Sequence, residues 1–182
     1  MNNISVRKSL ETIDKIIEFL NNGYTVLLES DVVGLMMHFC LSDPEIENNQ
    51  VHIDTRIKQS KKDSQKIDLA IGEICKQAET RPRVDANAIY EFKSIPESGF
   101  NDKQKRIRFG KILEDILKIQ ELKLAISRWI VVYDGVGYFD EERRGQIIEF
   151  RDKNDEGIEI VFVQKENDNW VRKYYPSLQN KD

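Results

Sequence analysis

The sequence has few of the residues that build disulfide frameworks or zinc sites. It contains two cysteines, Cys40 and Cys75, in 182 residues, and neither lies in a CxxC pair or a histidine-rich context. Small secreted domains and structural zinc sites need more cysteine, or cysteine and histidine at ligand spacing. We therefore expect two reduced thiols and a protein of the cytoplasm.

Long hydrophobic runs and nucleotide-binding loops are missing too. The longest apolar stretches, such as "WIVVY" (129–133), are far shorter than the roughly 20 residues that cross a bilayer. The N-terminal segment is polar and lacks the apolar centre of a signal peptide. No GxxxxGK[ST] loop occurs, and neither His38 nor His52 has a Cys, Ser or second His at triad spacing. The sequence thus predicts neither a membrane partner nor a P-loop enzyme.

The balance of charge is slightly acidic, with 28 Lys and Arg against 32 Asp and Glu and a net charge of −4. Such a total does not favour a protein that coats itself with nucleic acid, but the local field is what binds phosphate. Two segments, 56–66 and 103–111, are locally basic. A solvated loop and a solvated helix face are the simplest interpretation of them.

Apolar periodicity predicts the order helix, helix, three strands, helix, strand, helix, strand. The expected helices are 9–22, 30–40, 102–124 and 139–154, and the expected strands are 51–57, 66–72, 88–95, 128–135 and 157–165. Residues 75–87 are expected to form an irregular excursion. Three meandering strands followed by helix-linked strands define an α/β fold, with a mixed central sheet flanked by helices. We expect one domain over residues 1–182, in which 1–28 form an N-terminal helical extension and 164–182 a C-terminal extension.

Three ionisable residues interrupt the apolar pattern of two successive strands. Asp68 in "KIDLAI" points away from the face of Ile67, Leu69 and Ile71, whereas Glu91 and Lys93 in "AIYEFKSIP" share one face of their strand. A buried charge is costly unless it is paired or holds a cation. Two carboxylates with a few waters suit Mg²⁺ or Mn²⁺. Alternatively, Glu91 and Lys93 form a salt bridge and Asp68 is exposed.

"KIDLAI" followed on the next strand by "IYEFK" resembles the PD-(D/E)xK nuclease superfamily, which has the restriction-endonuclease-like fold. The resemblance implies that Asp68 and Glu91 bind Mg²⁺ (or Mn²⁺) and that Lys93 assists the attacking water. Many members also place a glutamate on a helix before the first strand of the sheet. Glu29 is the closest match to that residue, and Glu11 is a weaker one.

The resemblance covers the element order from about residue 29 to residue 163, with two departures from the family pattern. No proline precedes Asp68, and the separation between Asp68 and Glu91 is long. The triplet ExK alone is weak evidence, because "ELK" at 121–123 also matches although it lies in a helical pattern. Only "EFK" follows a strand that carries a lone aspartate.

The resemblance implies a divalent-metal-dependent nuclease that acts on DNA or RNA, with DNA preferred, and possible homodimers for cleavage of two strands. The alternative is a nuclease-like domain that no longer cuts and serves as a nucleic-acid-binding or assembly module, since a fold does not dictate chemistry. The segment "WVRKYYP" near the C-terminus allows two interpretations as well. Its aromatic and basic side chains either contact nucleic acid or pack on the sheet.

Overall fold

The structure is a computed structural model of the chain, and it describes residues 5–57, 66–75, 82–122, 127–155 and 157–178. Within these residues the chain forms four α-helices, one short 3-10 helix and six β-strands. The helices are α1 (Val6–Asn21), α2 (Glu29–Leu41), η1 (Asn48–Gln50), α3 (Asp102–Gln120) and α4 (Glu141–Asn154). The strands are β1 (Val51–Thr55), β2 (Ile67–Cys75), β3 (Arg83–Ile95), β4 (Ser127–Asp134), β5 (Glu159–Glu166) and β6 (Asn169–Tyr175).

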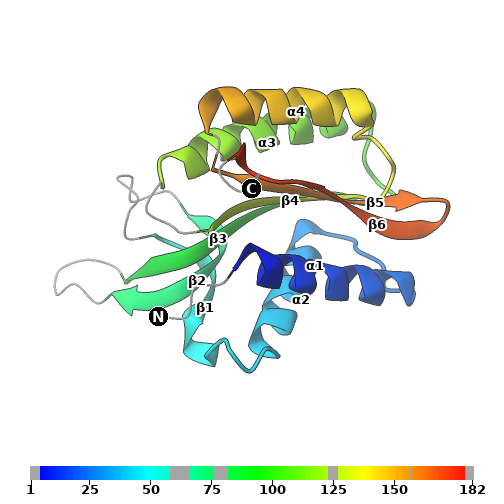
Figure 1. Cartoon of the computed structure of the whole chain (residues 1–182). Helices are drawn as coiled ribbons and strands as arrows, with labels where there is room; N and C mark the ends of the chain where they lie inside the picture. Colours follow the sequence, from blue (N-terminus) through cyan, green and yellow to red (C-terminus); the bar gives the residue numbers. More distant parts are fainter. Residues whose placement is uncertain (1–4, 58–65, 76–81, 123–126, 156, 179–182) are drawn as a thin grey trace.

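The strands form one mixed sheet in the order in which they follow one another along the chain. β1, β2 and β3 are an antiparallel meander, β3, β4 and β5 are parallel, and β6 is antiparallel to β5. α3 and α4 make the two parallel crossovers, and right-handed crossovers between successive neighbours place both helices on one face. Figure 1 shows α3 and α4 above the sheet and α1 and α2 below it. The predicted α/β fold class, a mixed sheet between helices, is therefore confirmed.

The sheet separates two hydrophobic clusters, one on each face. All eight residues of β4 are buried, as the continuous apolar run "WIVVY" predicts for a strand covered on both sides. Trp129, Val131 and Tyr133 belong to the cluster under α1 and α2. Ile130 and Val132 belong to the cluster under α3 and α4. The two layers of helix thus each enclose part of the core.

The largest error of the sequence-based elements concerns residues 75–87. Instead of an irregular excursion, β2 continues to Cys75 and β3 begins at Arg83, so the two strands pair over a long antiparallel hairpin. Residues 76–81 lie outside the described part of the chain, as does most of the basic segment 56–66. Leu69 and Ile71 face α1 and α2 as expected, whereas Ile67 belongs to the opposite cluster.

The sequence did not predict β6, which forms from the aromatic and basic segment "WVRKYYP". The Trp170 side chain is 4% exposed, and its ring stacks on the ring of Tyr133 with centroids 4.6 Å apart. Tyr174 stacks on Trp129 in the same cluster. These aromatic rings therefore pack on the sheet, as the second interpretation holds. None of the helices in the described part of the chain combines the length and apolar character of a bilayer-spanning segment.

Candidate functional site

β2 and β3 separate next to Asp68. Their antiparallel pairing extends to Leu69 and Tyr90, after which β2 pairs with β1 at Ile67 and β3 pairs with β4 as far as Ile95. An edge strand exposes backbone amides that need partners. The fork between β2 and β3 therefore opens a polar space within an otherwise apolar sheet.

Two carboxylates satisfy the amides of β3 that face this fork. The N–H of Phe92 donates to Asp68 Oδ2 at 2.8 Å, and the N–H of Ser94 donates to Glu29 Oε2 at 3.3 Å. Glu29 is the first residue of α2, so the start of this helix sets its position. These carboxylates take the place of the missing neighbouring strand, and this brings both acids to the fork.

Lys93 lies within the fork, where three carboxylates surround its ammonium group. Its Nζ is 2.8 Å from Asp115 Oδ2, 3.8 Å from Glu29 Oε1 and 3.9 Å from Asp68 Oδ2. The same Nζ donates a hydrogen bond to the carbonyl oxygen of Phe92 at 2.6 Å. Burial alone lowers the pKa of Lys93, but the charges of Asp115 and Glu29 outweigh it, so its pKa lies above the ordinary value. Lys93 is therefore a cation at neutral pH.

Glu91 is the most deeply buried acid of the site, with 1% of its surface exposed. It forms an ion pair with Lys118 of α3 rather than with Lys93. Burial raises the pKa of Glu91 to about 9, and the negative charges of Asp68 and Asp115 act in the same direction, while Lys118 lowers it. Asp68 is thus close enough to Glu91 for its charge to act on the protonation of the buried acid.

The sequence analysis missed the contribution of α3. An Asn101 and Gln104 capping box starts this helix, and its buried stripe is Ile112, Asp115, Ile116 and Ile119. A carboxylate within an apolar helical stripe is the signal that identifies Asp115, because an unpaired charge is rarely buried there. Lys118 follows one turn later, and Arg108 precedes Asp115 by two turns.

Arg108 closes the outer side of the site. Its guanidinium NH1 is 3.1 Å from Glu29 Oε2 and lies over the ring of Phe100 at 5.5 Å from the centroid. Burial raises the pKa of Glu29, and the cations Lys93 and Arg108 only partly oppose this, so the net shift is upward. Glu29 is thus the acid that lies between the buried lysine and the rim of the site.

The structure brings together all four predicted site residues, namely Asp68, Glu91, Lys93 and Glu29, although their catalytic roles remain predictions. The alternative salt bridge between Glu91 and Lys93 is not formed, since each pairs with a residue of α3. Glu11, the weaker candidate for the helix glutamate, is more than half exposed and pairs with Arg7. The control triplet "ELK" begins at Glu121 beyond the end of α3, and its lysine is outside the described residues.

The acids of the fork supply carboxylate oxygens, which are ligands for some metal ions and not for others. Within the described ranges, no group of three or more His, Cys, Asp and Glu side chains is arranged to hold a metal. Mg²⁺ keeps several waters and commonly takes only one or two protein carboxylates, whereas zinc prefers four nitrogen and sulfur ligands. The carboxylates of Asp68 and Glu91 are ligands of the type that Mg²⁺ or Mn²⁺ accepts rather than zinc, and metal binding by these two residues stays a prediction.

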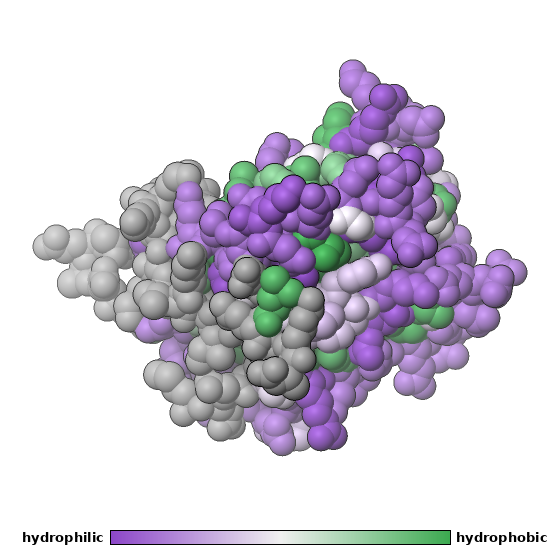
Figure 2. Space-filling model, turned by 45° about the horizontal axis from the view of Figure 1, so that its top comes forward, coloured by the Kyte–Doolittle hydropathy of each residue, from purple (hydrophilic) through white to green (hydrophobic). Residues whose placement is uncertain are grey.

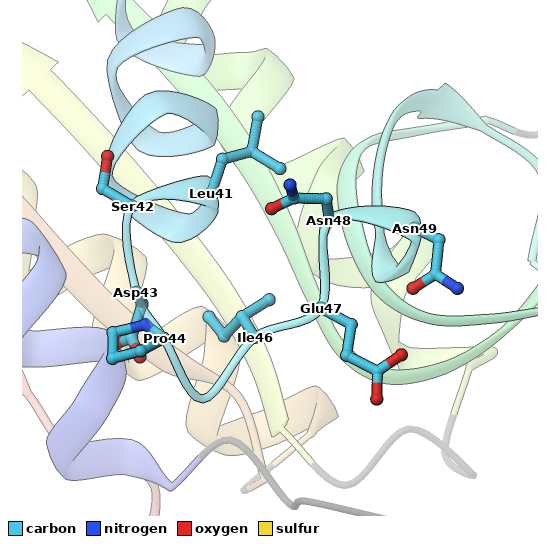
Figure 3. A pocket seen from close by; sticks show the side chains of 8 residues that line it. All are labelled: Leu41, Ser42, Asp43, Pro44, Ile46, Glu47, Asn48 and Asn49. Carbon is cyan, nitrogen blue, oxygen red and sulfur yellow. The ribbon is translucent and has the colours of Figure 1, made fainter.

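A separate hollow of about 540 Å³ lies in the connection between α2 and β1. Side chains between residues 41 and 49 line it, and Figure 3 shows them around the loop. The hollow contains no residue of the fork, and Asp43 in its lining is already paired with Lys8 at 2.9 Å. This hollow is therefore separate from the fork.

The buried acid predicts how stability depends on pH. Because burial outweighs the ion pair with Lys118, the pKa of Glu91 in the folded state is raised from its ordinary value of 4.5 to about 9, and between these values the folded state binds more of this proton than the unfolded state does. The free energy of unfolding is therefore expected to fall as the pH rises through this interval, by on the order of 1 kcal/mol per pH unit.

Glu91→Gln mimics the protonated acid and is expected to flatten this slope. Urea unfolding of both proteins over this pH interval, without divalent cations, measures the difference. Equal slopes in the two proteins would show that Glu91 is already ionised in the fold. Glu114→Gln, an exposed substitution on α3, is the control and is expected to leave the slope unchanged.

Comparisons with known proteins identify no family for this chain. No protein-family model matches the chain, and no curated protein sequence matches it. A solved structure that does match is that of SfsA from Pyrococcus furiosus in complex with Ca²⁺, at 12% identity and a TM-score of 0.36. The match covers 82% of this chain and 64% of that chain, so this chain spans less than two thirds of the length of SfsA. A likeness of this size supports no conclusion about function.

Proposed function

We propose that the protein is a divalent-metal-dependent nuclease of the PD-(D/E)xK type. The observation that carries this proposal is the fork, where Asp68, Glu91 and Lys93 meet beside two further acids. A structural salt bridge needs one acid and one base, but here four carboxylates gather around two lysines and an arginine. Two of the four acids, Glu91 and Asp115, are buried, and such a cluster is costly to stability and typical of a functional site.

Each residue of the fork has a chemical task in this proposal. Asp68 and Glu91 would hold Mg²⁺ or Mn²⁺ through carboxylate oxygens. The bound cation would polarise the scissile phosphate and lower the pKa of a water molecule. Lys93 stays protonated beside Asp115, so it does not act as a base. Its ammonium group orients the attacking water or stabilises the negative charge that develops on the phosphate.

The second candidate function is a nuclease-like domain that binds nucleic acid without cutting it. The observation that favours it is the ion pair between Glu91 and Lys118, which already neutralises one of the two predicted metal ligands. In this case the lysines and Arg108 serve as the permanent counter-charges of the acids.

A cleavage assay tests the proposal against this alternative. The protein is incubated with labelled single-stranded and double-stranded DNA and RNA, in Mg²⁺, in Mn²⁺ and in EDTA. Metal-dependent cleavage of any substrate supports the nuclease. Binding without cleavage of every substrate supports the second candidate.

Metal binding is tested separately through thermal stability. Mn²⁺ is expected to raise the melting temperature, and at a concentration of about 100 times its Kd the gain in free energy of unfolding is about 2.7 kcal/mol. Asp68→Asn is expected to abolish this gain, while its amide oxygen can still accept the N–H of Phe92. Glu47→Gln, an exposed change in the α2–β1 connection, is the matched control. An Mn²⁺ response that persists in Asp68→Asn would place the cation elsewhere.

A further inference from the structure

The first half of α3 is strongly basic in a chain that is acidic overall. Residues 101–111 contain five basic side chains and one acidic side chain, and Lys103, Arg106 and Lys111 are exposed. Basic residues in the first turns of a helix oppose the helix dipole. Two of these cations pair with acids of the same helix, Lys105 with Asp102 at 3.5 Å and Lys111 with Glu114 at 2.6 Å. Lys103 and Arg106 are exposed near the start of α3, where they produce a local positive field suited to phosphate groups.

This basic segment begins at the candidate site. Arg108, which belongs to this segment, forms an ion pair with Glu29 at 3.1 Å. Further along α3, Asp115 and Lys118 pair with Lys93 and Glu91 in the fork. A chain of phosphates that lies along residues 103–111 would therefore run toward Lys93. The face of the molecule shown in Figure 2 is mainly hydrophilic, with small separate hydrophobic groups.

Exposed apolar side chains flank the same ion pair. Leu27 and Leu28 are 65% and 64% exposed and directly precede Glu29, and Ile107 is 52% exposed and directly precedes Arg108. Leu28 occupies the N-cap position of α2, where Ser, Thr, Asn or Asp would stabilise the helix better. Leucine at this position therefore does not serve the helix, but it offers an apolar contact at the rim of the site.

Basic and apolar side chains together distinguish between kinds of nucleic acid. A duplex presents phosphates and keeps the faces of its bases stacked inside, whereas a single strand offers unstacked bases as well as phosphates. Glu91 and Lys93 are 1% and 7% exposed, while the Glu29 and Asp68 side chains retain 26% and 30%. The outer acids of the fork are therefore accessible from solvent, and a flexible single strand can bend to reach them.

From these observations we infer that residues 103–111 and the Leu27–Leu28 pair form a binding surface for single-stranded nucleic acid. The phosphates lie along α3, the bases contact Leu28 and Ile107, and the strand enters the fork past Arg108. The inference rests on the proposed function in that it names the substrate class of the same site. It concerns binding, however, and binding does not require that the strand be cut.

Binding in EDTA tests the inference without any cleavage. Fluorescence anisotropy measures the affinity of fluorescein-labelled single-stranded and duplex oligonucleotides of equal length. The single strand is expected to bind more tightly. Lys103→Ala/Arg106→Ala is expected to weaken this binding about tenfold and to reduce the slope of log K against log salt concentration by about 1.4, as for two lost phosphate contacts. Alanine is compatible with α3.

Leu28→Ser is the second variant, and it improves the N-cap of α2, so a loss of binding cannot be ascribed to unfolding. It is expected to weaken binding of the single strand several-fold without changing the salt slope. Arg7→Ala/Lys153→Ala removes the same charge from exposed positions on α1 and α4 and is expected to bind like wild type.

Two results would overturn the inference: preference for the duplex, or variants that bind like wild type. A third result would also overturn it. If Leu28→Ser converts a dimer into monomers without changing the affinity for oligonucleotides, Leu27 and Leu28 form a dimer interface instead. The proposed function fails independently. If the oligonucleotides bind as expected but no metal-dependent cleavage occurs, the binding surface is supported and the nuclease proposal fails. If the variants of the surface cleave like wild type, the nuclease proposal is supported and the binding surface fails.

Discussion

Lys93→Met is expected to reduce metal-dependent cleavage by a factor of about 10³, comparable to the loss of a preorganised donor at an oxyanion. Methionine preserves most of the side-chain volume but removes the ammonium group that the three acids hold in the fork. In the proposed reaction this charge offsets the negative charge that develops on the phosphate, so its removal is expected to raise the barrier. Steady-state cleavage of a single-stranded oligonucleotide in saturating Mn²⁺ measures the effect.

The matched control is Lys153→Met, which removes an exposed lysine from α4. It is expected to cleave at the wild-type rate. A Lys93→Met protein that remains folded and cuts within about threefold of wild type would exclude the lysine from the reaction, since one lost transition-state donor costs far more.

Lys93→Met is also expected to destabilise the fold, by about 3–5 kcal/mol, because it leaves the carboxylate of Asp115 buried without its partner. Asp115 is 8% exposed, and Lys93 is the cation closest to its Oδ2 in the described structure. The double variant Lys93→Met/Asp115→Asn removes both charges and is expected to recover most of the lost free energy of unfolding.

The double variant separates stability from catalysis. Urea unfolding of wild type, both single variants and the double variant forms a double-mutant cycle and gives the coupling energy of the pair. We expect the double variant to be folded and still inactive, since the ammonium group is absent. A loss in the double variant equal to the sum of the losses in the two single variants would mean that the pair contributes no coupling energy to the fold.

The sequence was sufficient to predict the α/β class because "WIVVY" and "IVFV" are continuous apolar runs and the helices between them are amphipathic. It also located Asp68, Glu91 and Lys93, because isolated charges in apolar strands are conspicuous. It failed at residues 75–87, where charged residues of a long, partly exposed hairpin hide the period-2 pattern. Tertiary packing, not local propensity, extends these strands.

The partners of the site were harder to predict, because they come from another element of the chain. Asp115 and Lys118 lie on α3, more than twenty residues after Glu91, and no spacing rule relates a helix to a strand that it covers. The alternative interpretation of the sequence therefore paired Glu91 with Lys93, its nearest cation on the same face. In the structure Glu91 and Lys93 do not pair with each other, because Lys118 and Asp115 of α3 are their partners.

The capping of β3 by Asp68 and Glu29 has a consequence for related chains of this architecture. The two acids accept hydrogen bonds from amides of β3 that face no neighbouring strand. A related chain without enzymatic activity would therefore still need both acids to hold β3 in place. Their presence alone would not mark an active enzyme. Lys93 accepts no backbone amide, but it pairs with Asp115. The joint replacement of Lys93 and Asp115 in a related chain would therefore be the more informative sign of a fork without activity.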